Sequence, residues 1–159
     1  MVRHAEASQP NGGLPDKYRS LTSGGMIDAT RMGRHLTTLI PKIDQIVASD
    51  AERNRMTADI FLEQFHLEKT QLILDETLYE GSPRHYLGAM NGLSEKSGAV
   101  MIVGHNPSIS YLAEYLCKHE FGNIPTCGVV ALQFDNLKWA EISKYSGTFL
   151  FYDSPDGKI

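Results

Sequence analysis

Two short apolar runs that each end in a histidine constrain the fold most. Met1 and Val2 lead into Arg3 and His4, and the run 99–103 leads into Gly-His-Asn-Pro at 104–107. Apolar runs bounded by Gly and Pro are typical of strands that are buried on both faces of a parallel sheet. In such sheets, ligand-binding groups gather at the carboxyl ends of the strands. The two histidines and the arginine are therefore expected to meet at one site.

The rest of the chain alternates between helix and strand patterns. Helices are expected at about 23–40, 51–65, 84–93 and 107–118, with Thr22 or Ser23 as the first N-cap and Ser49 or Asp50 as the second. Strands are expected at 43–48, 71–74, 99–103, 128–134 and 138–144, with a hairpin turn at 135–136, and 148–152 is expected to be a further strand or an extended tail. This order predicts a three-layer α/β/α sandwich with a mostly parallel central sheet and an antiparallel edge. At 159 residues, one domain spanning 1–159 is expected.

The N-terminal region has two unusual features. Strands usually contain about 5–6 residues, yet only Met1 and Val2 precede Arg3, so the first strand is either very short or begins in residues upstream of this sequence. The segment 8–20 is rich in turn formers and predicts a loop. A loop of that length within a compact domain is more often functional than not.

Composition and charge exclude several classes of protein. A formal charge of −4 argues against a nucleic-acid partner. No apolar run approaches the ~20 residues of a membrane span, and no signal peptide opens the chain, so a cytoplasmic protein without membrane contacts is expected. Cys117 and Cys127 lack the spacing of a zinc site and are expected to be reduced thiols, although a disulfide between them stays open.

Several catalytic motifs are missing from the sequence. G-x-G-x-x-G after a strand, the P-loop pattern, H-E-x-x-H and G-x-S-x-G all have no match. Dinucleotide binding, P-loop chemistry, ordinary zinc catalysis and serine-hydrolase chemistry therefore lack support. No cofactor and no metal ion are expected.

Arg3, His4, Arg53 and His105 remain as candidates, each at a strand-to-helix junction, with Glu80 in a neighbouring loop. A guanidinium group presents a planar fork that matches phosphate oxygens. A neutral imidazole can attack phosphorus and form a phosphohistidine intermediate. Nearby helix N-termini would add backbone donors for the same anion. These residue types together predict phosphoryl transfer.

Four motifs in order carry a family resemblance. The sequence Val-Arg-His-Ala-Glu at 2–6 resembles the L-V-R-H-[AG]-E signature of the histidine phosphatase superfamily, which includes the cofactor-dependent phosphoglycerate mutases. Three further segments resemble R-P-L-T-x-x-G, S-S-P-x-x-R-A-x-Q-T-A and V-G-H-N-P, and they lie at 19–25, 49–58 and 103–107. The resemblance spans nearly the whole chain and implies a phosphoglycerate mutase-like fold.

The resemblance also implies roles for individual residues. His4 would be the phosphorylated nucleophile. Arg3, Arg53 and His105 would form the phosphate pocket, and Glu80 lies where members of the family place a proton donor. Arg19 and Asn106 would contribute to phosphate binding. Asp50 replaces a serine of the family motif, where it would either pair with a neighbouring arginine or weaken the affinity for anions.

The short length and the segment 125–128 are similar to the small SixA-like phosphohistidine phosphatases. The expected function is therefore that of a protein phosphohistidine phosphatase acting on a partner of the histidine-phosphotransfer type. One alternative is a phosphomonoesterase acting on a small phosphorylated metabolite. The other is a non-catalytic phosphate-binding domain, which the joint presence of all four candidate residues disfavours.

Overall fold

The computed structural model describes residues 1–10 and 12–157. Its centre is a six-stranded sheet with the strand order β3-β2-β4-β1-β5-β6. Strands β1 to β4 are parallel, whereas β5 runs antiparallel to β1 and β6 antiparallel to β5. The bounds are β1 Val2–Arg3, β2 Gln45–Ser49, β3 Leu72–Asp75, β4 Val100–Gly104, β5 Val129–Gln133 and β6 Thr148–Asp153. The mostly parallel sheet with an antiparallel edge is confirmed.

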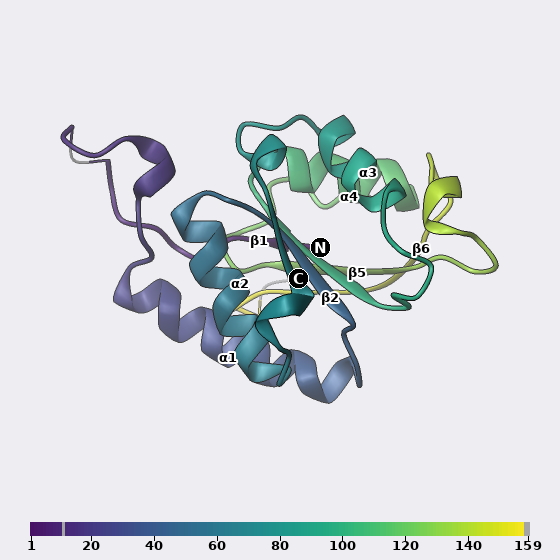
Figure 1. Ribbon diagram of the computed structural model, residues 1–159, viewed down its shortest axis with the longest axis horizontal. Helices are drawn as coiled ribbons and strands as arrows, with labels where there is room; N and C mark the ends of the chain where they lie inside the picture. Colours follow the sequence, from purple (N-terminus) through teal and green to yellow (C-terminus); the bar gives the residue numbers. More distant parts are fainter. Residues whose placement is uncertain (11, 158–159) are drawn as a thin grey trace.

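Helices cover both faces of the sheet (Figure 1). On one face lie α1 (Ser23–Leu39) and α2 (Glu52–Gln64), and on the other lie α3 (Pro83–Asn91) and α4 (Ser108–Cys117). Short 3₁₀ helices are η1 (Asp16–Tyr18), η2 (Lys69–Gln71), η3 (Glu76–Leu78) and η4 (Trp139–Glu141). Side chains of β2 alternate between the two layers, since Ile46 packs in the cluster under α1 and α2 while Val47 packs in the cluster under α3 and α4. The three-layer α/β/α sandwich is thereby confirmed.

The register of the central strands brings the two histidine motifs to one level. Val2 lies opposite Val103 and Arg3 opposite Gly104, so His4 and His105 each follow directly on paired residues of β1 and β4. Ala48 of β2 also lies opposite Val103. The carboxyl ends of β1, β2 and β4 therefore form one edge from which the candidate site is built.

The prediction of a strand at 138–144 is wrong. That segment contains η4 and turns, and β5 pairs instead with β6, so of the strand and the extended tail predicted for 148–152 the strand is confirmed. The Trp139 indole donates a hydrogen bond to the Ser97 carbonyl at 2.7 Å. The Asn91 amide donates to the carbonyls of Trp139 at 2.7 Å and Ile142 at 3.0 Å. These side-chain bonds to α3 and its loop hold the backbone away from the sheet ladder.

Helix α1 begins at the expected cap. The Thr22 side chain accepts a hydrogen bond from the Gly25 backbone N–H at 2.9 Å. A Cβ on Gly25 would lie 2.2 Å from the Glu6 carbonyl oxygen, so this position needs a glycine. The start of α1 is thus locked against the segment that follows His4.

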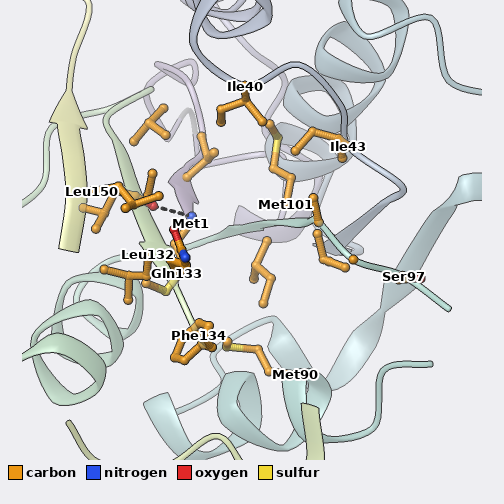
Figure 2. A pocket seen from close by; sticks show the side chains of 18 of the residues that line it. Met1, Ile40, Ile43, Met90, Ser97, Met101, Leu132, Gln133, Phe134 and Leu150 are labelled. Carbon is orange, nitrogen blue, oxygen red and sulfur yellow. Dashed lines mark hydrogen bonds between the residues drawn. The ribbon is translucent and has the colours of Figure 1, made fainter. Parts of the chain in front are cut away.

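A cavity of about 550 Å³ lies at the opposite end of the strands from His4, between the start of β4 and β5. Figure 2 shows Met1 at its wall, where the N-terminal amine donates to the Val130 carbonyl at 2.7 Å. Burial lowers the pKa of this amine to about 5. The lining is mostly apolar and holds neither of the two candidate histidines.

In the part of the chain that the structure describes, no helix combines the length and the hydrophobicity that crossing a membrane requires.

Candidate active site

His4 sits at the carboxyl end of β1, where backbone contacts from three segments fix it. Its N–H donates to the Gly104 carbonyl at 3.0 Å, and its own carbonyl accepts from the Cys127 N–H at 3.1 Å. The next residue, Ala5, donates its N–H to the Thr57 hydroxyl on α2 at 3.0 Å. The position of the His4 ring is therefore set by the sheet and by α2 together.

Among the described residues, only one of the two His4 ring nitrogens has a hydrogen-bond partner. Nδ1 lies 2.7 Å from the Ala5 carbonyl oxygen, which can only accept, so Nδ1 carries the proton and Nε2 keeps its lone pair. Burial lowers the pKa of His4 to about 4. The hydrogen bond to Ala5 acts to raise this pKa, whereas the positive charges of the nearby arginines, Arg53, Arg3 and Arg19, lower it further. At neutral pH the ring is uncharged and able to act as a nucleophile.

His105 lies beside His4, as the sequence predicted. The two ring centroids are 5.3 Å apart and the ring planes meet at 64°. His105 Nε2 lies 2.9 Å from the Ser49 hydroxyl at the end of β2, and the His105 N–H donates to the Tyr86 hydroxyl at 3.1 Å. Burial, followed by the charges of His4 and Arg53, lowers the pKa of His105 to about 3. The second histidine is therefore also neutral at pH 7.

Arg3 reaches across to the loop before β5. Its Nη1 donates to the Ile124 carbonyl at 2.7 Å, while its Nε is buried with no hydrogen-bond partner among the described residues. The Asn106 amide donates to the same carbonyl at 2.8 Å and to Asn123 Oδ1 at 2.7 Å. Both N–H groups of Asn106 are thus used in supporting this loop, and its role as a phosphate ligand stays a prediction.

Arg53 and Arg19 meet on one carboxylate that the sequence analysis missed, that of Asp16 on η1. Arg53 Nη1 donates to the Asp16 carbonyl at 2.8 Å, and Nη2 donates to Asp16 Oδ2 at 2.9 Å. Arg19 holds Asp16 Oδ1 through Nε at 2.8 Å and Nη2 at 2.7 Å. Burial alone would raise the pKa of Asp16, but hydrogen bonds from Arg19, Arg53 and Tyr79 lower it to about 2.

Tyr79 is a second residue that the sequence analysis did not propose for the site. Its hydroxyl donates to Asp16 Oδ2 at 3.0 Å, and its ring centroid lies 5.8 Å from that of His105. Glu80, the expected proton donor, follows directly with φ at 56° and an exposed side chain. Among the described residues, no hydrogen bond joins Glu80 to His4 or His105. Its catalytic role stays a prediction.

Ser49 and Asp50 do not cap α2, whose N-cap is Ala51 without a side-chain hydrogen bond. Ser49 contacts His105, and Asp50 forms an ion pair with Lys17 at 2.6 Å. The Asp50 side chain thus pairs with a lysine and not with a neighbouring arginine. Within the described residues, no group of three or more His, Cys, Asp or Glu side chains is arranged to hold a metal ion.

The α/β fold matches that of solved phosphoglycerate mutase-like histidine phosphatase structures. The model of the histidine phosphatase superfamily (branch 1) matches residues 1–92, and the chain belongs to this family. An uncharacterized protein of Mycobacterium leprae is 26% identical over 97% of this chain and 99% of its own. The mitochondrial serine/threonine-protein phosphatase Pgam5 of Drosophila yakuba is 28% identical over all of this chain, which spans 59% of that protein.

Solved structures named SixA share the fold. The protein histidine phosphatase SixA complexed with tungstate superimposes with a TM-score of 0.82 at 21% identity, over 98% of this chain and 95% of that one. The putative phosphohistidine phosphatase SixA from Agrobacterium tumefaciens gives 0.76 at 24% identity, over 84% and 88%. Family and fold together support phosphatase activity for this chain.

Proposed function

We propose that this chain, as a single domain spanning residues 1–159, hydrolyses phosphohistidine on a partner protein through a phosphohistidine intermediate on His4. Phosphatase activity is supported by the family, and the likeness to SixA structures favours this substrate class. The partner would be a protein of the histidine-phosphotransfer type.

In the first step, the lone pair of His4 Nε2 attacks the substrate phosphorus. A bond forms between Nε2 and phosphorus as the bond from phosphorus to the substrate imidazole breaks. Arg3 and Arg53, with an N–H of neutral His105, stabilise the negative charge on the equatorial oxygens. The Nδ1 proton, held on the Ala5 carbonyl, keeps the attacking nitrogen in its unprotonated state.

In the second step, a water molecule attacks the same phosphorus. The new oxygen–phosphorus bond forms as the bond to His4 Nε2 breaks, and inorganic phosphate leaves with the water's proton shared between phosphate and solvent. His4 returns to its neutral state. Its low pKa, about 4, keeps the ring unprotonated for the next cycle at neutral pH.

The observation that carries the choice of substrate is the Asp16 carboxylate, whose two oxygens accept hydrogen bonds from Arg19, Arg53 and Tyr79. Asp16 is ionised, because its pKa is about 2, and so it cannot donate a proton near neutral pH. An alkoxide leaving group needs such a proton, and general acid catalysis typically contributes about 10²–10⁴-fold. An imidazole, with a reference pKa of ~6.5, can leave already protonated from solution. The arrangement therefore favours phosphohistidine over an alkyl phosphate.

A phosphomonoesterase acting on a small phosphate ester is the second candidate. Glu80 adjoins Tyr79, whose ring packs edge-on against His105, so its carboxyl group belongs to the segment that contacts the site. Pgam5 is named as a serine/threonine-protein phosphatase, and serine and threonine phosphates are alkyl esters. The two candidates differ in whether Glu80 is needed.

Glu80→Gln separates the two candidates. If the substrate is phosphohistidine, kcat/KM of Glu80→Gln for a phosphohistidine protein should stay within about twofold of the original value. Hydrolysis of alkyl phosphates should fall in this variant, or should already be negligible in the original chain. Glu76→Gln, an exposed glutamate on η3, is the matched control and should change neither activity. High activity on an alkyl phosphate that drops ~10²-fold or more in Glu80→Gln would favour the phosphomonoesterase.

A further inference from the structure

Two of the positive groups around His4, Arg53 and Arg19, are occupied by Asp16 of the chain itself. The two terminal nitrogens of Arg53 donate to the backbone carbonyl and to Oδ2 of Asp16. Asp16 Oδ1 accepts hydrogen bonds from two nitrogens of Arg19, and Oδ2 also accepts one from the Tyr79 hydroxyl. The third nitrogen of Arg19, Nη1, donates to the Ser8 carbonyl at 2.6 Å. The forks that phosphate would use on Arg53 and Arg19 are thus engaged.

The contacts of Asp16 resemble those expected of a bound oxyanion. A carboxylate offers two oxygens and about four lone-pair positions, and here both oxygens accept charge-assisted hydrogen bonds from guanidinium groups. Arg53 is almost fully buried, with 7% of its side chain exposed, whereas 48% of the Asp16 side chain is exposed. The Asp16 carboxylate is therefore much more accessible to solvent than Arg53, so an incoming anion can exchange with it.

A second contact ties η1 to the segment just before α2 without using an arginine. Lys17 pairs with Asp50 at 2.6 Å, just before α2, and its ammonium lies 5.5 Å from the centre of the Tyr79 ring. The loop that carries η1 otherwise extends outward from the body of the domain (Figure 1). Asp16 and Lys17 thus hold this loop, through neighbouring residues, against Arg53 and Asp50 at the start of α2.

We propose that Asp16 is a specificity-determining residue whose carboxylate competes with the phosphoryl group for Arg53 and Arg19. Binding of substrate then exchanges an internal anion for an external one, which lowers the affinity for phosphate groups as such. Small phosphate compounds and the product phosphate bind weakly, and a substrate with further contacts, such as a protein that carries phosphohistidine, is favoured. The inference rests on the proposed function in taking the pocket to be the phosphoryl site.

Tungstate binding tests the competition without requiring turnover. Asp16→Asn removes the charge but keeps the size, and isothermal titration calorimetry should show tungstate binding about 10- to 100-fold tighter than in the unmodified chain, since a hydrogen bond to a charged group contributes about 1.5–3 kcal/mol. KM for an aryl phosphate should fall with it, while kcat changes less. Lys17→Met should shift both values in the same direction by a smaller factor.

Asp28→Asn is the matched control. Asp28 is also a partly exposed aspartate paired with an arginine three residues on, but it lies on α1. Its substitution should leave tungstate affinity unchanged, which excludes a general effect of net charge. Tighter binding in Asp16→Asn supports the proposal even if phosphohistidine proves not to be the substrate. Weaker or unchanged binding in Asp16→Asn, with an unaltered melting temperature, would overturn it and leave Asp16 as a residue that only positions the two arginines.

Discussion

The hydroxyl group of Thr57 is predicted to support both the fold and the nucleophile. Thr57 is fully buried, accepts the Ala5 N–H at 3.0 Å and donates to the Arg53 carbonyl at 2.7 Å. Thr57→Val keeps the shape but leaves the Ala5 N–H buried without an acceptor, which costs about 1–3 kcal/mol. For a domain of this size, 1 kcal/mol corresponds to roughly 2–4 °C in Tm, so a cost near the middle of that range lowers Tm by roughly 4–8 °C.

Urea denaturation and a thermal melt measure this loss, and Thr37→Val is the matched control. Thr37 makes the same kind of bond, donating to the Arg34 carbonyl at 2.8 Å, but it is exposed on α1. Its substitution should stay within about 0.5 kcal/mol. Because the Ala5 carbonyl orients the His4 ring, kcat should also fall in Thr57→Val. A Thr57→Val chain as stable and as active as the original would refute the reasoning.

Two further predictions concern pH and metal ions. The folded-state pKa values of His4 and His105, about 4 and about 3, lie below the reference value of ~6.5. The unfolded chain therefore binds protons that the folded chain excludes, and the free energy of unfolding should fall as pH drops from about 6.5 toward 4. Urea denaturation at several pH values should show a shallower decline in His4→Asn; an unchanged slope would contradict the assignment. Phosphatase activity should survive a chelator, because Arg3 and Arg53 supply the positive charge, and the idea fails if one divalent ion is needed to restore activity.

Much of the candidate site follows from sequence because it depends on strand ends. Arg3, His4 and His105 come together since β1 and β4 are parallel neighbours in register, and a parallel sheet is what the apolar runs predict. Arg53 joins them because α2 starts directly after β2. Local patterns therefore predicted where these four residues lie, while their catalytic roles stay a prediction.

The residues that the sequence analysis missed act over long sequence distances. Asp16 lies 37 residues from Arg53 and 63 from Tyr79, and its loop has no helix or strand periodicity to indicate where it folds. An aspartate three residues before Arg19, within a long polar loop, was the one available signal. The strand expected at 138–144 fails for a related reason, since hydrogen bonds from Asn91 and Trp139 outweigh the local pattern.

Trapping the phosphorylated enzyme tests the central claim most directly. Rapid mixing with substrate, followed by alkaline quench and peptide mapping by mass spectrometry, should find an acid-labile, alkali-stable phosphate on His4. His4→Asn should carry no such phosphate and should lose turnover, while Asp28→Asn should behave like the original chain. Phosphate trapped on another residue, or turnover near the original rate in His4→Asn, would contradict the proposal that His4 is the nucleophile.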